Sequence, residues 1–327
     1  MKRSTRIAGL TAALAATALV AGCQRGPQTA ATAQAPTAEA DKTMTQQDPR
    51  FTLEEQAWRE QRRESLLKPD GWTSLIGLHW VDQGPHFVGS GGDNGIRLAM
   101  GPEHFGMIDL RKDGSVHFVP GKDAALTLDG QPLQGATTLR TDADPDGPSV
   151  IGFDDGKGVA TVIQRGDRYG LRVKHADAPT RVHFAGLDYW PADAAWRITG
   201  KFVPHPAGTT MQVANIIGGL DDAKNPGAVE FERGGKTYSI EAIDEGGGTL
   251  FLVFADRTNG HGSYGAGRFL DTPMPDAQGR VVIDFNQSRN PPCAFTSFAT
   301  CPLPPAQNRL DLAITAGEKA YAGDHGS

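Results

Sequence analysis

From Trp72 to the C-terminal region, short runs of alternating apolar and polar residues recur about every ten residues. Examples are "VHFV" at 116–119 and "RVVIDFN" at 280–286, and Gly, Asp-Gly or Asn-Gly separates most neighbouring runs. Alternation places the apolar side chains on one face of a β-strand. Glycine-containing turns join neighbouring strands into antiparallel pairs. The pattern therefore predicts a mainly β protein built from antiparallel sheets.

The β pattern divides into two regions near "LDYWPAD" at 187–193. We expect residues 50–185 to form a helix followed by an antiparallel β-sandwich, and residues 186–322 to form a second antiparallel sheet or barrel half. The run from Leu250 to Ala255 is apolar on both faces, which predicts a central strand that is covered on both sides.

One helix is predicted, over Phe51–Leu67, in the stretch "FTLEEQAWREQRRESLL". Thr52 and Glu55 have the spacing of a capping box, and "KPDG" at 68–71 ends the helix. Its glutamates and arginines carry both signs of charge, so we expect them to lie on a solvated face.

The first 22 residues have the layout of a lipoprotein signal peptide. Three cations precede the apolar run Ile7–Ala21, and small residues precede Cys23. We expect the thiol of Cys23 to be acylated and residues 23–49 to form a disordered tether. Gln24 follows the cysteine, which favours a protein held in the outer membrane by its lipid and facing the periplasm.

The charge of the chain argues against nucleic acid as a partner. The net charge is −6 at pH 7, and removal of the three leader cations makes the mature chain more acidic. Such a chain is a poor match to a phosphate backbone. No motif identifies a cofactor, and the spacing of the cysteines lacks the second Cys/His pair of a metal site.

Polar residues interrupt the β pattern in the C-terminal stretch. Asp256 opens the glycine-rich loop 256–270, which also contains Arg268, and Asp284 and Asn286 share one side of the strand "VVIDFN". Glu318 follows a glycine turn. These five residues are candidates for the rim of a ligand site, because arginine binds carboxylate or phosphate and acids transfer protons. A structural ion pair or a turn explains each of them equally well when it is taken singly.

The segment "RNPPCAFTSFATCPLPPAQNRL" at 289–310 has too many prolines to form a helix or a central strand. It carries Cys293 and Cys301. The two thiols are candidates for a disulfide, since Cys23 would be acylated and an even pair would remain. The alternative is that Cys293 is a nucleophile, with His261 as its base.

The stretches "SYGAGRFL", "DFNQSRNPPCAF" and "CPLPPAQNRLDLAITAGEK" resemble the domain of unknown function 1684 family, and the similarity extends from Trp58 to Tyr321. The resemblance implies a mostly β domain without an established reaction. It adds Tyr264 and Asn290 to the candidate ligand-binding residues. Ser263 and Arg289 depart from the Thr and Tyr that the family often has. The family also has members without a leader, which weakens the disulfide hypothesis and favours a site role for the two cysteines. The residues that match the family motifs are Tyr264, Gly265, Arg268, Asp284, Asn286, Asn290, Cys293, Cys301, Asn308 and Glu318.

The first β region is also similar to a forkhead-associated sandwich, through "GSGGDNGIRL" at 89–98. The phosphopeptide-binding Arg and Ser-x-x-His of that family are not matched. The similarity therefore concerns the fold alone and disfavours a phosphopeptide reader.

Two hypotheses on function remain. The first is a lipid-anchored envelope protein with a pocket for a small ligand or substrate in the C-terminal β region. If it is an enzyme, hydrolysis by carboxylates or by a Cys293 nucleophile is the expected class. The alternative is a non-catalytic envelope module for binding or assembly. A carboxyl group with a perturbed pKa in a concave pocket would favour the first hypothesis.

Overall fold

The structure is a computed structural model that describes residues 48–325. The predicted signal peptide, Cys23 and nearly all of the predicted tether lie outside the described residues. Within the described range, every helix is too short or too polar to cross a membrane. The protein is mainly β, with one long helix at its start, which confirms the predicted fold class.

Helix α1 spans Pro49–Leu66 and begins earlier than predicted. Its N-cap is Asp48, whose carboxylate accepts a hydrogen bond from the backbone N–H of Arg50 at 2.9 Å. Pro49 suits the first helical position, where no N–H is needed. The predicted capping box of Thr52 and Glu55 is therefore wrong, and the Glu55 side chain is buried instead.

The first β part is a sandwich of two sheets, as predicted. Its core contains the rings of Phe105, Phe118 and Phe153; the Phe118 ring is tilted against that of Phe105 and the Phe153 ring meets it edge to face, with centroids 5.4 and 5.5 Å away. All strand pairs in it are antiparallel except β2 with β3. One sheet has the order β1(Leu75–Val81), β11(Arg168–His175), β10(Gly158–Arg165), β9(Ile151–Phe153), β6(Thr127–Leu128), β7(Gln131–Pro132). The other has the order β3(Ile96–Arg97), β2(Gly84–Gly89), β4(Gly106–Leu110), β5(Val116–Pro120), β8(Thr137–Leu139).

The second β part contains one larger sheet and two hairpins, and in the described residues none of them closes into a barrel. The sheet has the order β16(Lys236–Ala242), β15(Gly227–Arg233), β12(Arg197–Pro204), β19(Arg280–Asp284). The hairpins are β13(Thr210–Ala214) with β14(Leu220–Lys224), and β17(Thr249–Phe254) with β18(Arg268–Pro273). Residues 250–254 are all buried, which confirms β17 as a strand covered on both sides.

Short helical turns connect these strands. They are η1(Trp72–Ser74), η2(Asp154–Gly156), α2(Pro179–Val182), η3(Ala194–Trp196), η4(Phe285–Gln287), η5(Pro292–Ala294) and η6(Ala306–Asn308). After β19 the chain has no further regular strand up to residue 325. This C-terminal segment is still densely packed, because Phe285, Phe295 and Ile314 are almost completely buried.

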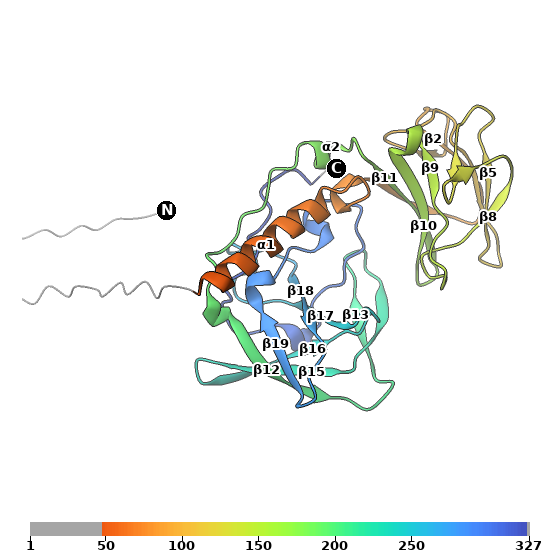
Figure 1. Cartoon of the computed structure of the whole chain (residues 1–327). Coiled ribbons are helices and arrows are strands. Elements are labelled where there is room, and N and C mark those ends of the chain that lie inside the picture. Colours follow the sequence, from red (N-terminus) through yellow and green to blue (C-terminus); the bar gives the residue numbers. More distant parts are fainter. Residues whose placement is uncertain (1–47, 326–327) are drawn as a thin grey trace, which may run out of the picture. The chain divides into compact units, whose positions relative to one another are not determined.

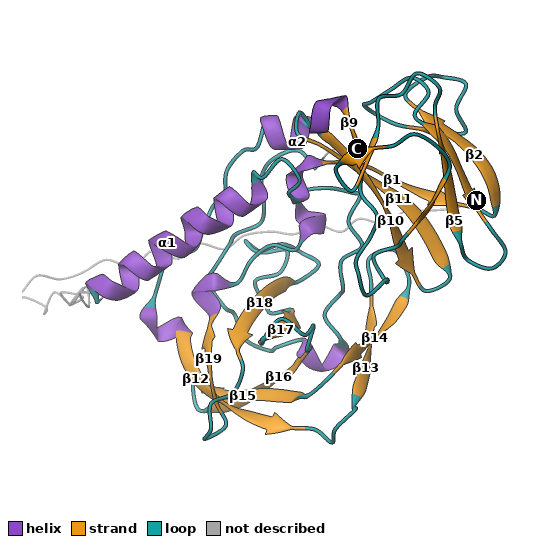
Figure 2. Ribbon diagram, turned by 45° about the vertical axis from the view of Figure 1, so that its right-hand side comes forward, coloured by secondary structure: helices purple, strands orange, loops and turns teal. Residues whose placement is uncertain are grey.

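Helix α1 packs against the second β part, although the first β part follows it in sequence. It contacts η4, and Arg197 at the start of β12 forms ion pairs with Glu54 and Glu55 of the helix. Figures 1 and 2 show the helix beside β12 and β19. Residues at the start of the described chain are thereby packed against β12 and η4, which lie more than 100 positions later in the sequence.

Candidate anion-binding cavity

Arg268 and Asp256 form an ion pair inside the protein. The Arg268 Nη2 atom donates to Asp256 Oδ2 at 2.5 Å, and both side chains are fully buried. The same guanidinium donates to the carbonyl oxygens of Ala316 at 2.6 Å and Ile314 at 3.0 Å. Burial lowers the pKa of Arg268, and the charge of Asp256 opposes that shift. Through these hydrogen bonds, Arg268 and Asp256 hold the C-terminal segment against β18.

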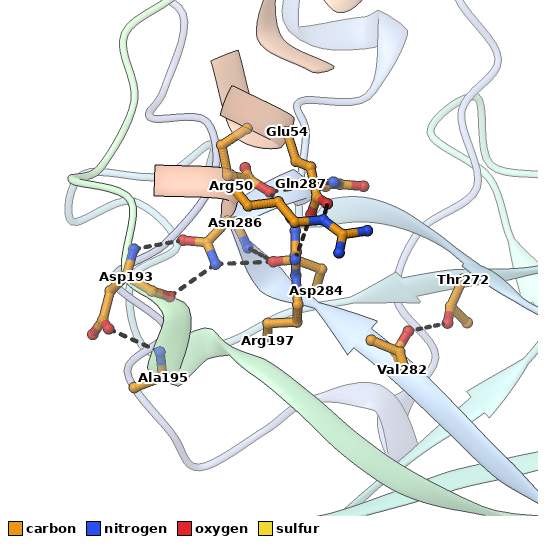
Figure 3. A network of polar contacts seen from close by, with 11 residues as sticks. Arg50, Glu54, Asp193, Ala195, Arg197, Thr272, Val282, Asp284, Asn286 and Gln287 are labelled. Carbon is orange, nitrogen blue, oxygen red and sulfur yellow. Dashed lines mark hydrogen bonds and ion pairs between the residues drawn. The ribbon is translucent and has the colours of Figure 1, made fainter. Parts of the chain in front are cut away.

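Asp284 and Asn286 belong to a second network, which Figure 3 shows. Asp284 accepts a hydrogen bond from Arg197 Nε at 2.5 Å and another from Asn286 Nδ2 at 2.9 Å. Asn286 also exchanges two hydrogen bonds with the backbone of Asp193, at 2.9 and 3.0 Å. Arg197 continues to Glu54 of α1 at 2.7 Å. This network fastens the helix and the 193–195 turn to the end of β19.

Glu318 and Asn290 form a third cluster. The buried Glu318 carboxylate accepts from the backbone N–H of Asn290 at 2.7 Å and from Arg62 Nε of α1 at 2.8 Å. Arg62 also donates to the Asn290 carbonyl oxygen at 3.0 Å. The expectation of a solvated charged face on α1 is therefore wrong for Arg62, as it is for Glu55.

Tyr264 lies beside the cysteines. Its hydroxyl donates to the carbonyl oxygen of Cys293 at 3.2 Å and lies 3.6 Å from the Cys293 sulfur. Burial raises the pKa of Tyr264. Cys293 and Cys301 are free thiols in the structure, and the backbone N–H of Cys293 contacts the Cys301 sulfur at 3.1 Å. His261, considered as a base for Cys293, hydrogen-bonds to the carbonyl oxygen of Asn259.

The acids and the arginine that the sequence suggested do not face a common space. Asp256, Arg268, Asp284, Asn286 and Glu318 are divided among the three networks above and bind other protein groups. Of the predicted residues, Asn290 and Cys301 line a cavity of about 380 Å³. The cavity lies where α1, strand β10 and the loop after β19 meet. Its lining residues are Arg62, Leu66, Trp72, Arg165, Glu245, Phe251, Phe269, Arg289, Asn290, Pro292, Phe295, Thr300, Cys301 and Pro302.

Two arginines converge at Thr300, which lines this cavity; Arg165 lines it too, whereas Arg172 reaches Thr300 from outside the lining. Arg165 Nε and Arg172 Nη2 both donate to the Thr300 hydroxyl oxygen, at 3.2 and 3.3 Å. Arg165 is also paired with Asp142 at 2.8 Å. Among residues 48–325 no carboxylate forms an ion pair with Arg172, and its buried Nε atom has no hydrogen-bond partner. Burial first, and then the charge of Arg165, lower the pKa of Arg172 to about 10.

Besides Arg165, the cavity wall contains the guanidinium groups of Arg289 and Arg62. Arg289 is paired with Asp271 at 2.8 Å, and burial lowers its pKa. Each guanidinium has five N–H donors, and the hydrogen bonds of Arg62, Arg165 and Arg289 to protein groups use fewer than that. The cavity therefore offers donors in excess of acceptors.

Glu245 is the acidic residue of the lining; the residue as a whole is exposed, while its carboxyl group is partly covered by the surrounding chain. Burial of its carboxyl group and the charge of Asp271 raise its pKa, while Arg289 opposes the shift. A carboxyl group of this kind takes up a proton more readily than an ordinary surface glutamate.

Aromatic rings form the apolar part of the wall. Phe251 and Phe269 meet edge to face, with centroids 4.8 Å apart. The Arg62 guanidinium lies 5.7 Å from the Phe295 ring centroid, and that of Arg172 lies 5.6 Å from the Trp72 ring centroid. A ligand in this space would meet both guanidinium groups and aromatic rings.

The four charged residues of the lining lack a local sequence signal that would identify them. Arg62 belongs to a mixed-charge helix, and Arg165 begins the "RGDRYG" turn between β10 and β11. Glu245 sits in the glycine-rich loop before β17. Arg289 was noticed only as a departure from a family motif. No spacing rule links these positions, because each comes from a different element.

Residues 182–319 match the family described as "Protein of unknown function (DUF1684)", as the sequence motifs predicted. The matched range is shorter than the similarity from Trp58 to Tyr321, and it covers most of the second β part. No curated protein matches the chain. A solution NMR structure of an uncharacterized protein from Haloarcula marismortui is similar, with 28% sequence identity over 42% of this chain and 78% of that chain and a TM-score of 0.36.

Proposed function

We propose that this chain, a member of the DUF1684 family through residues 182–319, is an envelope lipoprotein that binds a small anion with an apolar body in the cavity described above. The ligand class is an organic carboxylate or phosphate. Cys23 would carry the lipid that holds the protein at the outer membrane.

The convergence of Arg165 and Arg172 on Thr300 carries the proposal. Two guanidinium groups on one neutral oxygen repel each other, and only Arg165 has a carboxylate partner among the described residues. An anion placed beside Thr300 would relieve this repulsion. Arginine suits the task because its planar fork binds carboxylate or phosphate through two parallel hydrogen bonds.

The size and the wall of the cavity define the rest of the ligand. A volume of about 380 Å³ lies at the small end of the range for ligand pockets. Phe251, Phe269 and Phe295 would cover an apolar or aromatic group, whereas a fully hydrated ion would gain no apolar contact with these rings.

Calorimetric titration of the full chain tests the binding. We expect phenyl phosphate to bind more tightly than either inorganic phosphate or phenol, because only phenyl phosphate has both the anionic and the aromatic part. Arg172→Met removes the positive charge beside Thr300 that has no carboxylate partner in the described part of the chain, and Thr300→Val removes the hydroxyl at that position. Each should weaken phenyl phosphate binding by about tenfold, which corresponds to about 1.4 kcal/mol.

Arg140→Met is the matched control for these variants. Arg140 is an arginine of the first β part that lies outside the cavity lining and, unlike Arg172, donates to Gly147 and Asp129 rather than to Thr300. Its replacement should leave the affinity unchanged. The anion site is refuted if wild type binds none of the three probes, or if Arg172→Met binds phenyl phosphate as tightly as wild type. Either result would favour the alternative of a non-catalytic envelope module for binding or assembly.

The lipid anchor needs a test of its own. We expect labelled palmitate to be incorporated into the wild-type chain and to be absent from Cys23→Ser, with the wild-type protein recovered in the outer-membrane fraction. Incorporation into Cys23→Ser, or a wild-type protein that is not membrane-associated, would contradict the anchor.

A further inference from the structure

The proline-rich loop brings two sulfur atoms together beside the cavity. Cys293 follows the pair Pro291-Pro292, and Cys301 precedes Pro302. The backbone N–H of Cys293 contacts the Cys301 sulfur at 3.1 Å. Both thiols are free, and Cys293 is partly exposed whereas Cys301 is buried and lines the cavity. Neither sulfur has a role in the anion binding proposed above.

The surroundings make the two thiols unequal. The hydrogen bond from the Cys301 thiol lowers the pKa of Cys293, and the Tyr264 hydroxyl contributes in the same direction. The interaction with Cys293 and burial raise the pKa of Cys301. The partly exposed sulfur is therefore the one that ionises first, which is the property of an attacking cysteine.

Cys301 is connected to the arginines of the cavity through its neighbour. Thr300 holds Arg165 and Arg172 through its hydroxyl, while the carbonyl oxygen of Cys301 accepts from the backbone N–H of Ile216 at 2.9 Å. Prolines on both sides limit the backbone rotations that could absorb a displacement of either sulfur. A covalent change at Cys301 is therefore transmitted to Thr300.

We propose that Cys293 and Cys301 form a reversible dithiol–disulfide pair, and that the disulfide weakens binding of the anion beside Thr300. The first half of this inference stands on the cysteines alone. The second half rests on the proposed function, because it requires the anion site.

The chemistry is disulfide exchange with an external disulfide, such as oxidised glutathione or a dithiol oxidase. The Cys293 thiolate attacks one sulfur of that disulfide, and the other sulfur leaves as a thiolate and takes up a proton. Cys301 then loses its proton and attacks the Cys293 sulfur, which expels the second thiolate. The protein gains one S–S bond and loses two hydrogens, and the external disulfide is reduced to two thiols.

The test uses the full chain with Cys23→Ser, which leaves two cysteines. The protein is equilibrated across a series of glutathione redox buffers, and its free thiols are counted by maleimide labelling and mass spectrometry. We expect both thiols to disappear together, within one chain, and to return on reduction. Thiols that stay free at every ratio, or that link only different chains, would overturn the pair.

Single substitutions distinguish the two roles. Cys301→Ser should retain glutathione on Cys293 as a stable mixed disulfide, because the resolving thiol is gone, whereas Cys293→Ser should stay unmodified. Tyr264→Phe should slow alkylation of Cys293 at neutral pH, because a hydrogen bond that favours the thiolate is lost. Equal modification of both single variants would overturn this order of attack. The redox-buffer test keeps both Cys293 and Cys301. It therefore still decides whether the disulfide forms if one of the single variants fails to fold.

Phenyl phosphate titration of the reduced and the oxidised protein tests the coupling. We expect at least a severalfold loss of affinity on oxidation, reversed by reduction. Equal affinity in the two states would overturn the coupling. If neither state binds phenyl phosphate, the proposed function fails, while the thiol counts still decide whether the redox pair exists.

Discussion

The guanidinium of Arg268 and the carboxylate of Asp256 are in contact at 2.5 Å with both side chains withdrawn from solvent. Removal of one partner from such a pair leaves a charge buried without compensation, which costs about 3–5 kcal/mol. We expect Arg268→Met to lose about that much unfolding free energy in a urea titration. Asp256→Asn should lose a comparable amount.

Anion binding separates this structural role from a direct role in the site. Arg268→Met that is still folded should bind phenyl phosphate like wild type, since Arg268 does not line the cavity and contacts Asp256, Ile314 and Ala316 rather than Thr300. A variant with wild-type stability and impaired binding would return Arg268 to the list of ligand contacts.

Gly317 occupies a position that only glycine fits. Its φ is +80°, and an added Cβ would come within 2.4 Å of the Ser288 carbonyl oxygen. Gly260 has a similar φ of +75° but open space around it. In thermal and urea unfolding, Gly260→Ala should lose about 1 kcal/mol from backbone strain alone, and Gly317→Ala about 3 kcal/mol or more. Equal losses would mean that the contact with Ser288 relaxes at no cost.

Glu55 should make the stability of the protein depend on pH. Burial, and then the charge of Asp284, raise the pKa of Glu55 above its ordinary value of 4.5. The folded state therefore holds this proton more tightly than the unfolded state. The unfolding free energy should fall as the pH rises from 4.5 through the raised value, by about 1.4 kcal/mol for each unit of pKa difference.

Glu55→Gln removes this ionisation and retains an oxygen that can accept from Arg197. Urea titrations over this pH range should show a smaller decline for the variant, and the variant should be at least as stable as wild type at neutral pH. Glu64→Gln, on the exposed face of α1, is the control. A Glu55→Gln profile parallel to that of wild type would contradict the assigned protonation.

Glu245 should make anion binding depend on pH. Its pKa is raised, so a rise in pH through that value adds a negative charge to the cavity lining. Benzenesulfonate keeps its own charge throughout and is a suitable probe. Its affinity should fall with rising pH by roughly fivefold, the effect of about 1 kcal/mol of repulsion.

The dependence should disappear in Glu245→Gln and persist in Glu232→Gln, which alters an exposed glutamate of β15. If the affinity of Glu245→Gln followed the same pH profile as that of wild type, another group would be responsible.

Local pattern was sufficient to predict much of the fold. Alternation of apolar and polar residues predicted β12 and β19, and the run that is apolar on both faces predicted β17. These predictions succeed because neighbouring residues of a strand point to opposite faces, so the burial of each face determines which residues are apolar. Asp48 as the N-cap was missed, because Thr52 and Glu55 offered an equally regular local signal. Local signals of equal quality cannot be ranked without the surrounding packing.

The site was less predictable, because its residues meet only through contacts distant in sequence. Arg165 reaches Thr300 across 135 positions, and Arg62 reaches Glu318 across 256. Polar residues that interrupt the C-terminal strands were correctly identified as unusual. Their chemistry did not reveal that Asp256 and Arg268 would bind each other, which leaves them few donors or acceptors for a ligand.

The carbonyl partners of Arg268 tie the interior of the second β part to a segment that has no strand of its own among the described residues. Ile314 and Ala316 follow β19, and their carbonyl oxygens satisfy a guanidinium whose burial would otherwise be unfavourable. Both residues also pack into the core cluster of that part. A cleavage that released this segment would therefore withdraw two acceptors from Arg268 and open the interior of the sheet at the same time.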